Sequence, residues 1–160
     1  MVYTKDMIRF IVLFVLSLLS TTTYAANLSG EARIVDGDTI WIGKMKIRLH
    51  GIDAPETRQE CLSRDGHPYR CGVASTDSLR ILVGSEPVRC EGDKYDRYKR
   101  LIAVCYSGTV NLNAEMVRQG WALAYRRYSK DYISAEKEAQ EAKRGMWAGE
   151  FEPPWEWRRK

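Results

Sequence analysis

Apolar and polar residues alternate along residues 39–50, with the period of two that is typical of β-strands. The apolar positions are Ile40, Ile42, Met45, Ile47 and Leu49. Gly43 and Lys44 separate the two alternating runs and offer a two-residue turn. The segment is therefore predicted to form a β-hairpin with one apolar face, in which Thr39 pairs with Arg48. Asp38 and Arg48 then lie side by side at its open end.

A second hairpin is predicted further along the chain. Its arms are Val88 to Glu91 and Leu101 to Tyr106, and its polar tip runs from Gly92 to Arg100. Centring the turn within this tip sets Cys90 opposite Cys105. Opposite residues of an antiparallel pair are close enough for their side chains to interact, so this register is compatible with a disulfide.

Helical periodicity and capping residues predict three helices. They are Gly72 to Val83 with Gly84 as its stop, a helix capped by Asn111 or Asn113 that ends at Gln119, and a helix capped by Ser129 that ends at Gly145. The last twelve residues, 149–160, contain two prolines, two tryptophans and three terminal basic residues. Because proline interrupts helices, this tail is predicted to be an irregular strap rather than a helix.

Short strands interleaved with helices indicate an α+β fold. A further strand is expected from Ala32 to Val35, ahead of a turn at Asp36-Gly37-Asp38. Among small β-barrels with helical additions, the OB-fold is common at this chain length. We therefore expect an OB-fold, a five-stranded Greek-key barrel with about three helices.

The first 25 residues resemble a cleavable export signal. Lys5 and Arg9 provide a positive start, Phe10 to Leu19 is apolar except for one serine, and Thr23-Tyr24-Ala25 ends on a small residue. An apolar run of roughly ten residues is about half the length that a spanning helix needs. We expect cleavage before Ala26, a periplasmic or secreted protein and no membrane attachment afterwards. Residues 26–148 would form the folded domain and 149–160 the strap.

The overall composition is that of a folded soluble domain. The 160 residues are 44% hydrophobic and 29% charged, which excludes a disordered, collagen-like or multi-span membrane protein. The formal net charge of +4 becomes +3 when residues 1–25 are removed. A net charge this small is weak evidence for a nucleic-acid partner. The distribution of charges along the chain is more informative.

Export favours disulfides for the four cysteines, Cys61, Cys71, Cys90 and Cys105. Four cysteines allow three pairings. We favour Cys61 with Cys71, which closes a short loop, and Cys90 with Cys105, which the second hairpin supports. A zinc site is the alternative, but the chain has no C-x-x-C motif and only two histidines.

Acidic and basic residues gather in three segments at predicted strand ends. These are Asp36 to Thr39, Arg48 to Thr57 and Asp96 to Arg100. Carboxylates without thiolate or imidazole partners suit a hard cation such as Ca²⁺. Arginines at two separated positions suit bidentate binding of a phosphate.

These segments resemble the staphylococcal nuclease-like (thermonuclease) family. The motifs are D-G-D-T, R-L-x-G-I-D-A-P-E-T, D-R-Y-x-R and V-R-Q-G-W-A, in this order between Ala32 and Trp147. The resemblance covers most of the chain, and the ordered set is specific although each motif alone is weak.

The resemblance implies a role for each matching residue. Asp38, Asp53 and the main-chain carbonyl of Ala54 would bind calcium, and Glu56 would act as general base or orient the attacking water. The other implied roles are phosphate binding in catalysis by Arg48 and Arg100, and substrate contact by Arg97, Tyr98 and Tyr125. Lys99 stands at a position that is often glycine in the family. Tyr125 can equally be a packing residue.

The resemblance further implies a calcium-dependent hydrolase that cuts DNA and RNA with little sequence specificity and leaves 3′-phosphates. Contacts would be to backbone phosphates, with single-stranded or frayed nucleic acid preferred, and we expect a monomer. The alternative is a noncatalytic OB-type module that binds single-stranded nucleic acid. Such a module would have no need of the acidic and arginine set that this chain keeps.

Overall fold

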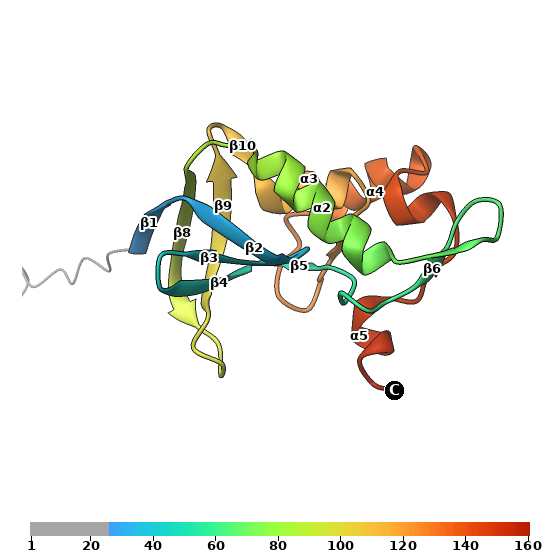
Figure 1. Cartoon of the computed structure of the whole chain (residues 1–160), viewed down its shortest axis with the longest axis horizontal. Coiled ribbons are helices and arrows are strands. Elements are labelled where there is room, and N and C mark those ends of the chain that lie inside the picture. The colour runs from blue at the N-terminus through green and yellow to red at the C-terminus, as the bar shows by residue number, and fades with distance from the viewer. Residues whose placement is uncertain (1–25) are drawn as a thin grey trace, which may run out of the picture.

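The fold is built on one twisted sheet in which the strands run in the order β1-β8-β9-β4-β3-β2, with β10 pairing to β9. The computed structural model describes residues 26–160, and the predicted signal peptide lies outside the described residues (Figure 1). The strands of this sheet are β1 (Ala26–Gly30), β2 (Ala32–Asp36), β3 (Thr39–Ile42), β4 (Met45–Leu49), β8 (Val88–Tyr95), β9 (Leu101–Ser107) and β10 (Val110–Asn111). The pair β4·β9 is parallel and the others are antiparallel.

The two predicted hairpins are confirmed with their registers. Thr39 pairs with Arg48 across β3 and β4, and Cys90 pairs with Cys105 across β8 and β9. The predicted end of the first arm of the second hairpin was wrong, since β8 continues to Tyr95. A register shift between Glu91 and Lys94 lets the strand continue beyond Gly92. A Cβ atom on that glycine would lie 2.2 Å from the Ile102 carbonyl oxygen, so the close approach of the two strands requires glycine.

Strand β1 was not predicted. It pairs along β8, with Leu28 opposite Cys90. Three short strand pairings complete the described part: β5 (Ile52–Asp53) pairs with β11 (Leu123–Ala124), β6 (Cys61–Leu62) pairs with β7 (Pro68–Tyr69), and Leu62 forms a bridge with Glu150. The β5–β11 pairing matters for function, because it fixes Asp53 opposite Leu123.

Helices α2, α3 and α4 lie together beside the sheet (Figure 1). The helices of the described part are α2 (Cys71–Val83), α3 (Leu112–Arg118), α4 (Ile133–Glu141), the 3-10 helix η1 (Gly145–Ala148) and α5 (Pro154–Trp157). Asn111 caps α3, since its side chain accepts a hydrogen bond from Ala114 N at 3.0 Å. None of these helices is long and apolar enough to cross a membrane.

Two helix predictions were wrong. Helix α4 begins at Ile133 rather than after Ser129, because the Ser129 hydroxyl accepts a hydrogen bond from Asp131 N and closes a local turn instead. The C-terminal strap contains the short helix α5. Proline is tolerated at a first helical position because the N–H that it lacks has no partner there, so Pro154 starts this helix instead of preventing it.

The core lies between the sheet and the helices. It joins the predicted apolar face of the first hairpin to the apolar faces of the helices. Its fully buried members include Ile40, Ile47, Leu49, Leu79, Leu101 and Met116.

Asn113, the other predicted cap, is instead buried and connects three main-chain groups. Its amide donates to the carbonyls of His50 and Ala103 and accepts from Cys105 N, at 2.9, 3.2 and 3.0 Å. The α+β OB-fold prediction is confirmed, with α5 as an addition.

Both predicted disulfides are present, Cys61–Cys71 and Cys90–Cys105. The first joins β6 to the first turn of α2, across 10 residues of sequence. Each bond restricts the unfolded chain, and a loop of this length is worth about 3 kcal/mol in the chain-entropy treatment.

Replacing Cys61 and Cys71 together by alanine is expected to lower the free energy of unfolding by about 3 kcal/mol. Guanidinium titration of the oxidised wild type and the double variant measures this change. A loss below about 1 kcal/mol would mean that the 61–71 loop is equally restricted in the unfolded chain without the bond.

Candidate active site

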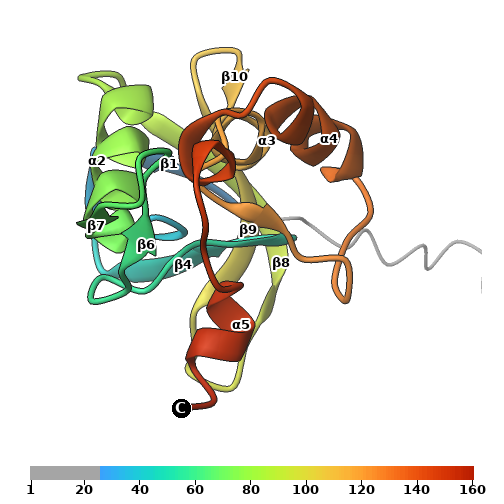
Figure 2. The same cartoon turned by 90° about the vertical axis from the view of Figure 1, so that its right-hand side faces the viewer.

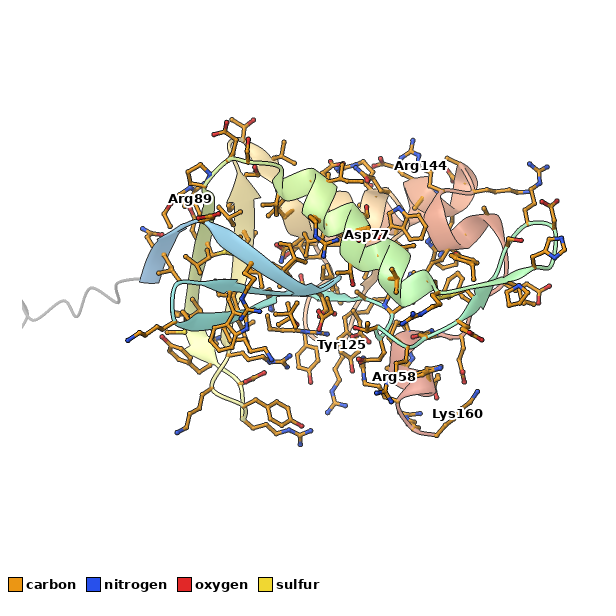
Figure 3. The ribbon with its side chains drawn as sticks, in the orientation of Figure 1. Arg58, Asp77, Arg89, Tyr125, Arg144 and Lys160 are labelled. Carbon is orange, nitrogen blue, oxygen red and sulfur yellow. A yellow bond between two sulfur atoms is a disulfide. The ribbon has the colours of Figure 1, made fainter. Side chains whose placement is uncertain are left out.

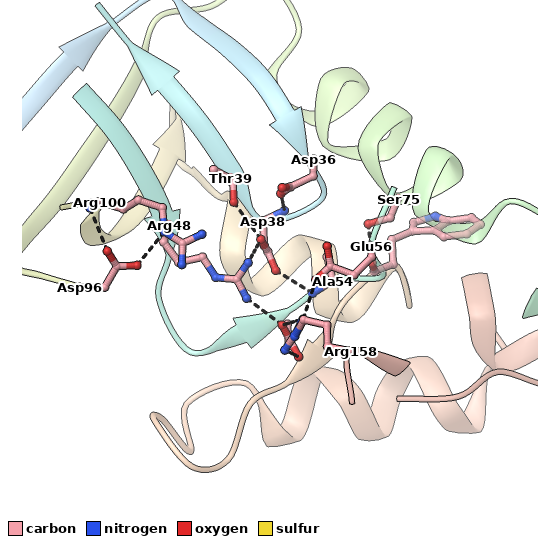
Figure 4. Close-up of polar contacts among 12 residues, drawn as sticks. Asp36, Asp38, Thr39, Arg48, Ala54, Glu56, Ser75, Asp96, Arg100 and Arg158 are labelled. Atoms are coloured by element: carbon pink, nitrogen blue, oxygen red, sulfur yellow. Dashed lines mark hydrogen bonds and ion pairs between the residues drawn. The ribbon is translucent and has the colours of Figure 1, made fainter. Parts of the chain in front are cut away.

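Two buried carboxylates meet around one arginine at the open end of the first hairpin (Figure 4). Asp38 precedes β3, Arg48 lies in β4, and Asp53 ends β5. Arg48 Nη2 donates to Asp53 Oδ1 at 2.7 Å, and Nη1 donates to Asp38 Oδ1. Asp38 is 2% and Asp53 0% exposed. Burial lowers the pKa of the Arg48 guanidinium, and the charge of Asp53 opposes this shift.

The turn before β3 holds Asp38 from several sides. Asp38 Oδ2 accepts a hydrogen bond from Ala54 N at 2.8 Å, which joins the first two acidic segments. The Thr39 hydroxyl donates to Asp38 Oδ1 at 3.1 Å. Burial also raises the pKa of Asp36, whose side chain accepts from Asp38 N, while Thr39 and Arg48 oppose the rise. The carboxylate of Asp38 is therefore fixed before any ligand arrives.

Glu56 follows this pair and lies at the edge of the site, with its side chain 38% exposed. Its position depends on the buried Gln59, which sequence reasoning missed. Gln59 Oε1 accepts from Glu56 N at 3.3 Å, and Nε2 donates to the carbonyl of Glu152 at 2.7 Å. One amide thus joins the loop that carries Glu56 to the C-terminal strap. No sequence signal marks Gln59, because its partners are a main-chain N–H and a carbonyl distant in sequence.

Arg100 is held at the tip of the second hairpin by Asp96. Asp96 accepts hydrogen bonds from Tyr98 N, Arg100 N and Arg100 Nε at 2.9, 2.9 and 2.6 Å. Partial burial disfavours the charged form of Asp96 and so raises its pKa, but these hydrogen bonds have the larger combined effect and lower the pKa. Asp96 therefore stabilises the tip above its unfolded pKa of about 3.9, and this contribution is lost as the pH falls through the lower folded value.

Lys99 adopts a left-handed backbone conformation, with φ +61°. The tip therefore keeps the turn that a glycine would favour, and Lys99 carries the strain. The side chains of Arg97 and Arg100 lie over the Tyr98 ring, at 4.9 and 5.5 Å from its centroid.

Lys99→Gly is expected to stabilise the fold by about 1 kcal/mol, because it relieves the left-handed strain of a residue with a Cβ atom. Thermal unfolding of the variant and the wild type measures the change. Lys94→Gly is the matched control, since Lys94 lies within β8 and glycine there should destabilise by about 0.5–1 kcal/mol. Equal shifts of the same sign for both variants would contradict this account of the turn.

A groove of about 1150 Å³ is lined by the predicted catalytic and substrate-binding residues, whereas the predicted metal ligands Asp38, Asp53 and Ala54 are not part of its lining. Its lining includes Arg48, Glu56, Arg97, Tyr98, Arg100, Tyr125 and Arg158. The hairpin tip and α5 extend toward the same side of the molecule (Figures 1 and 2). In Figure 3 the labelled Tyr125 lies between the hairpin and the C-terminal Lys160. Two of the three charged segments thus line one groove, and the first segment is joined to it through the ion pair of Asp38 with Arg48.

The three tyrosines that share helical spacing have different environments. Tyr132 is buried in the core, and burial raises its pKa to about 12. Tyr128 is 59% exposed. Tyr125 lines the groove, meets Tyr128 edge-on at 4.9 Å and stacks on Trp155 of α5 at 5.5 Å. Tyr125 therefore both packs and faces the groove, whereas Tyr98 is an exposed groove residue at 64%.

Arg158, which follows α5, is part of the site although it was not among the predicted site residues. Its Nη2 donates to Asp53 Oδ2 at 2.7 Å, and its Nη1 donates to Asp53 Oδ1 at 3.1 Å and to Glu56 Oε1 at 2.8 Å (Figure 4). Partial burial opposes its charge, but the bonds to Asp53 and Glu56 prevail and raise the pKa of Arg158 above its ordinary value. The only sequence signal was a basic tail.

The donor set suits a hard cation. Two buried carboxylates, Asp38 and Asp53, and the main chain of Ala54 offer only oxygen ligands. Both carboxylates are turned toward positive charge here, supplied by Arg48 and Arg158. Within residues 26–160 no group of three or more His, Cys, Asp or Glu side chains is arranged to hold a metal ion. The proposed set needs only two such side chains, so the residues fit a cation whose remaining ligands are main chain and solvent.

Comparison with known proteins places the chain in a family. The profile of the family described as "Staphylococcal nuclease homologue" matches residues 46–149. An uncharacterized endonuclease of Haemophilus influenzae is 36% identical over 156 residues, which cover 92% of this chain and 82% of that protein. A micrococcal nuclease of Shigella flexneri is 34% identical over 153 residues, 84% and 82% of the two chains. The succinoglycan biosynthesis protein ExoI of Rhizobium meliloti is 35% identical over 131 residues, 80% and 69% of the two chains.

Proposed function

Because this chain belongs to the staphylococcal nuclease family and is a hydrolytic nuclease, we propose that it is an exported, calcium-dependent enzyme. Its substrates are DNA and RNA, cut with little sequence specificity. The observation that supports this most directly is the groove lined by Arg48, Glu56 and Arg100, with two buried carboxylates, Asp38 and Asp53, bonded to Arg48 at its wall. A module that only binds nucleic acid has no use for buried carboxylates beside its phosphate site.

Each residue of the site has a part in the proposed reaction. Hydrolysis of a phosphodiester needs a water that loses a proton, and Glu56 accepts this proton or orients the water. Negative charge grows on the phosphoryl oxygens as phosphorus becomes five-coordinate, and Arg48 and Arg100 stabilise it with directed N–H groups. Asp38, Asp53 and the Ala54 carbonyl would hold Ca²⁺, which when bound polarises a phosphoryl oxygen. The expected products carry 3′-phosphates.

Weak sequence specificity follows from the kind of side chains in the groove. Arg97, Tyr98 and Arg100 form a rim around the hairpin tip and suit phosphate contacts rather than base edges. Single-stranded or frayed nucleic acid is preferred, because its backbone can enter the groove without deforming a duplex. Binding to phosphates weakens as salt rises.

Export, domain organisation and oligomeric state complete the proposal. Residues 1–25 are a cleaved signal peptide, residues 26–148 the catalytic domain and residues 149–160 the strap. The two disulfides are compatible with a periplasmic or secreted location. We expect the protein to act as a monomer.

The dependence of DNA and RNA cleavage on Ca²⁺ tests this proposal. The purified protein is incubated with denatured DNA and with RNA in Ca²⁺, then with chelator, and then with Ca²⁺ restored. We expect cutting with Ca²⁺, loss of at least about a hundredfold in chelator and full recovery on restoration. Products should resist extension by a polymerase until a phosphatase removes the 3′-phosphate. Undiminished cutting in chelator would exclude the calcium role, and binding without cutting in every divalent ion would indicate the noncatalytic module.

A further inference from the structure

The C-terminal strap delivers a positive charge to the acidic side of the site from 105 residues away in the sequence. Arg158 contacts Asp53, the proposed metal ligand, and Glu56, the proposed base, and its guanidinium binds both oxygens of Asp53. Its side chain is 35% exposed, whereas Asp53 is fully buried. Because Arg158 also lines the groove, it approaches the buried carboxylate from the groove side.

The hydrogen bonds at Asp53 leave little room for another ligand. Oδ1 accepts from both Arg48 Nη2 and Arg158 Nη1, and Oδ2 accepts from Arg158 Nη2. A carboxylate oxygen offers about two lone-pair positions, so Oδ1 is saturated and Oδ2 keeps one. A divalent cation at Asp53 would also repel the adjacent guanidinium. Full metal binding and the present position of Arg158 are therefore opposed.

The strap packs against the rest of the protein, so the position of Arg158 is fixed by more than its attraction to acidic side chains. Trp155 stacks on Tyr125 with the two rings 5° from parallel. The backbone of the strap is bound twice, by Gln59 at the Glu152 carbonyl and by Leu62 at Glu150, whose main-chain groups exchange hydrogen bonds at 2.8 and 3.0 Å. These contacts place α5 beside the groove at a fixed position.

We propose that Arg158 is a built-in competitor of the catalytic metal: its guanidinium occupies Asp53 and Glu56 when no metal is bound, and metal binding displaces it into the groove. This inference rests on the proposed function, because it takes Asp53 as a metal ligand. Displacement frees the Glu56 oxygen that Arg158 now occupies, so the base and the metal ligand become available together. Arg158 therefore sets the metal concentration at which the enzyme becomes competent.

Calorimetric titration of Ca²⁺ tests the competition without using catalysis. Wild type, Arg158→Ala and Arg158→Gln are compared with Arg159→Ala, a matched control whose arginine pairs with Glu156 on the same turn. We expect both Arg158 variants to bind Ca²⁺ on the order of tenfold more tightly than wild type, and Arg159→Ala to bind as wild type does. Unchanged or weaker binding by both Arg158 variants would overturn the proposal.

A second measurement follows the strap itself. Hydrogen exchange of residues 153–160 in wild type should become faster when Ca²⁺ is added, because the ion pairs of Arg158 are lost, and exchange that stays equal or slows would count against displacement. The failures are distinguishable. If no variant binds Ca²⁺, the calcium part of the proposed function fails. If all bind it equally, that function stands and only the competition is wrong.

Discussion

Glu56→Gln is expected to lower kcat on denatured DNA by about a thousandfold, because glutamine keeps the shape of the side chain but cannot accept the proton of the attacking water. Affinity for Ca²⁺ should be retained or slightly tightened, since Glu56 lies outside the proposed ligand set and its loss weakens the hold on Arg158. Single-turnover cleavage measures the chemical step, and calorimetry measures the metal.

Glu60→Gln is the control for this substitution. Glu60 lies four positions further along the same loop and is exposed, so the same chemical change there should leave kcat unaltered. If Glu56→Gln keeps more than about a tenth of wild-type kcat, Glu56 is not the base, and water activation must come from another group of the groove.

Gly72→Ala is expected to reduce kcat by about a hundredfold without altering any group that reacts. A Cβ atom on Gly72 would lie 1.8 Å from the Glu56 carbonyl oxygen and 2.9 Å from Thr57 Cα, and these main-chain atoms can yield only by moving the loop. A shift of about 1 Å in the position of a catalytic group can cost two orders of magnitude in rate. Overpacking should also lower the free energy of unfolding by about 1–3 kcal/mol.

A double-mutant cycle shows whether this effect passes through Glu56. In the Glu56→Gln background, Gly72→Ala should cost little further kcat, because the group that it displaces no longer accepts a proton. Gly108→Ala is the control: its Cβ would meet nothing within 4 Å, and its φ of +56° predicts only about 1 kcal/mol of strain and normal kcat. Equal, additive losses in both backgrounds would mean that Gly72 acts on the fold as a whole.

The hairpins show what could be predicted locally and why some boundaries were missed. The register of β3 and β4 follows from a period of two and a two-residue turn, both visible within twelve residues. The extension of β8 to Tyr95 depends on a register shift that no periodicity marks. Strand β1 was missed because its partner, β8, lies some sixty residues away, and an edge strand this short has little pattern of its own.

The residues of the candidate site also form two groups, those that were predicted from the sequence and those that were not. Asp38, Arg48, Asp53, Glu56 and Arg100 were named because charged residues gather at predicted strand ends and because their ordered motifs resemble those of a family. Gln59 and Gly72 went unnoticed. Their importance lies in contacts with main-chain atoms, and a main-chain partner leaves no trace in the residue type of the neighbour.

The hairpin registers, the α+β OB-fold and the family could be predicted from sequence, since each rests on local period, spacing or ordered motifs. The two disulfide pairs were favoured among three possible pairings, and the structure contains them. The formation of α5 in the tail, and the contacts of Arg158 with Asp53 and Glu56, became visible only in the folded molecule. The physical reason is that such a contact depends on how Trp155 and Gln59 dock the strap, and packing between segments so far apart has no periodicity that a sequence can display.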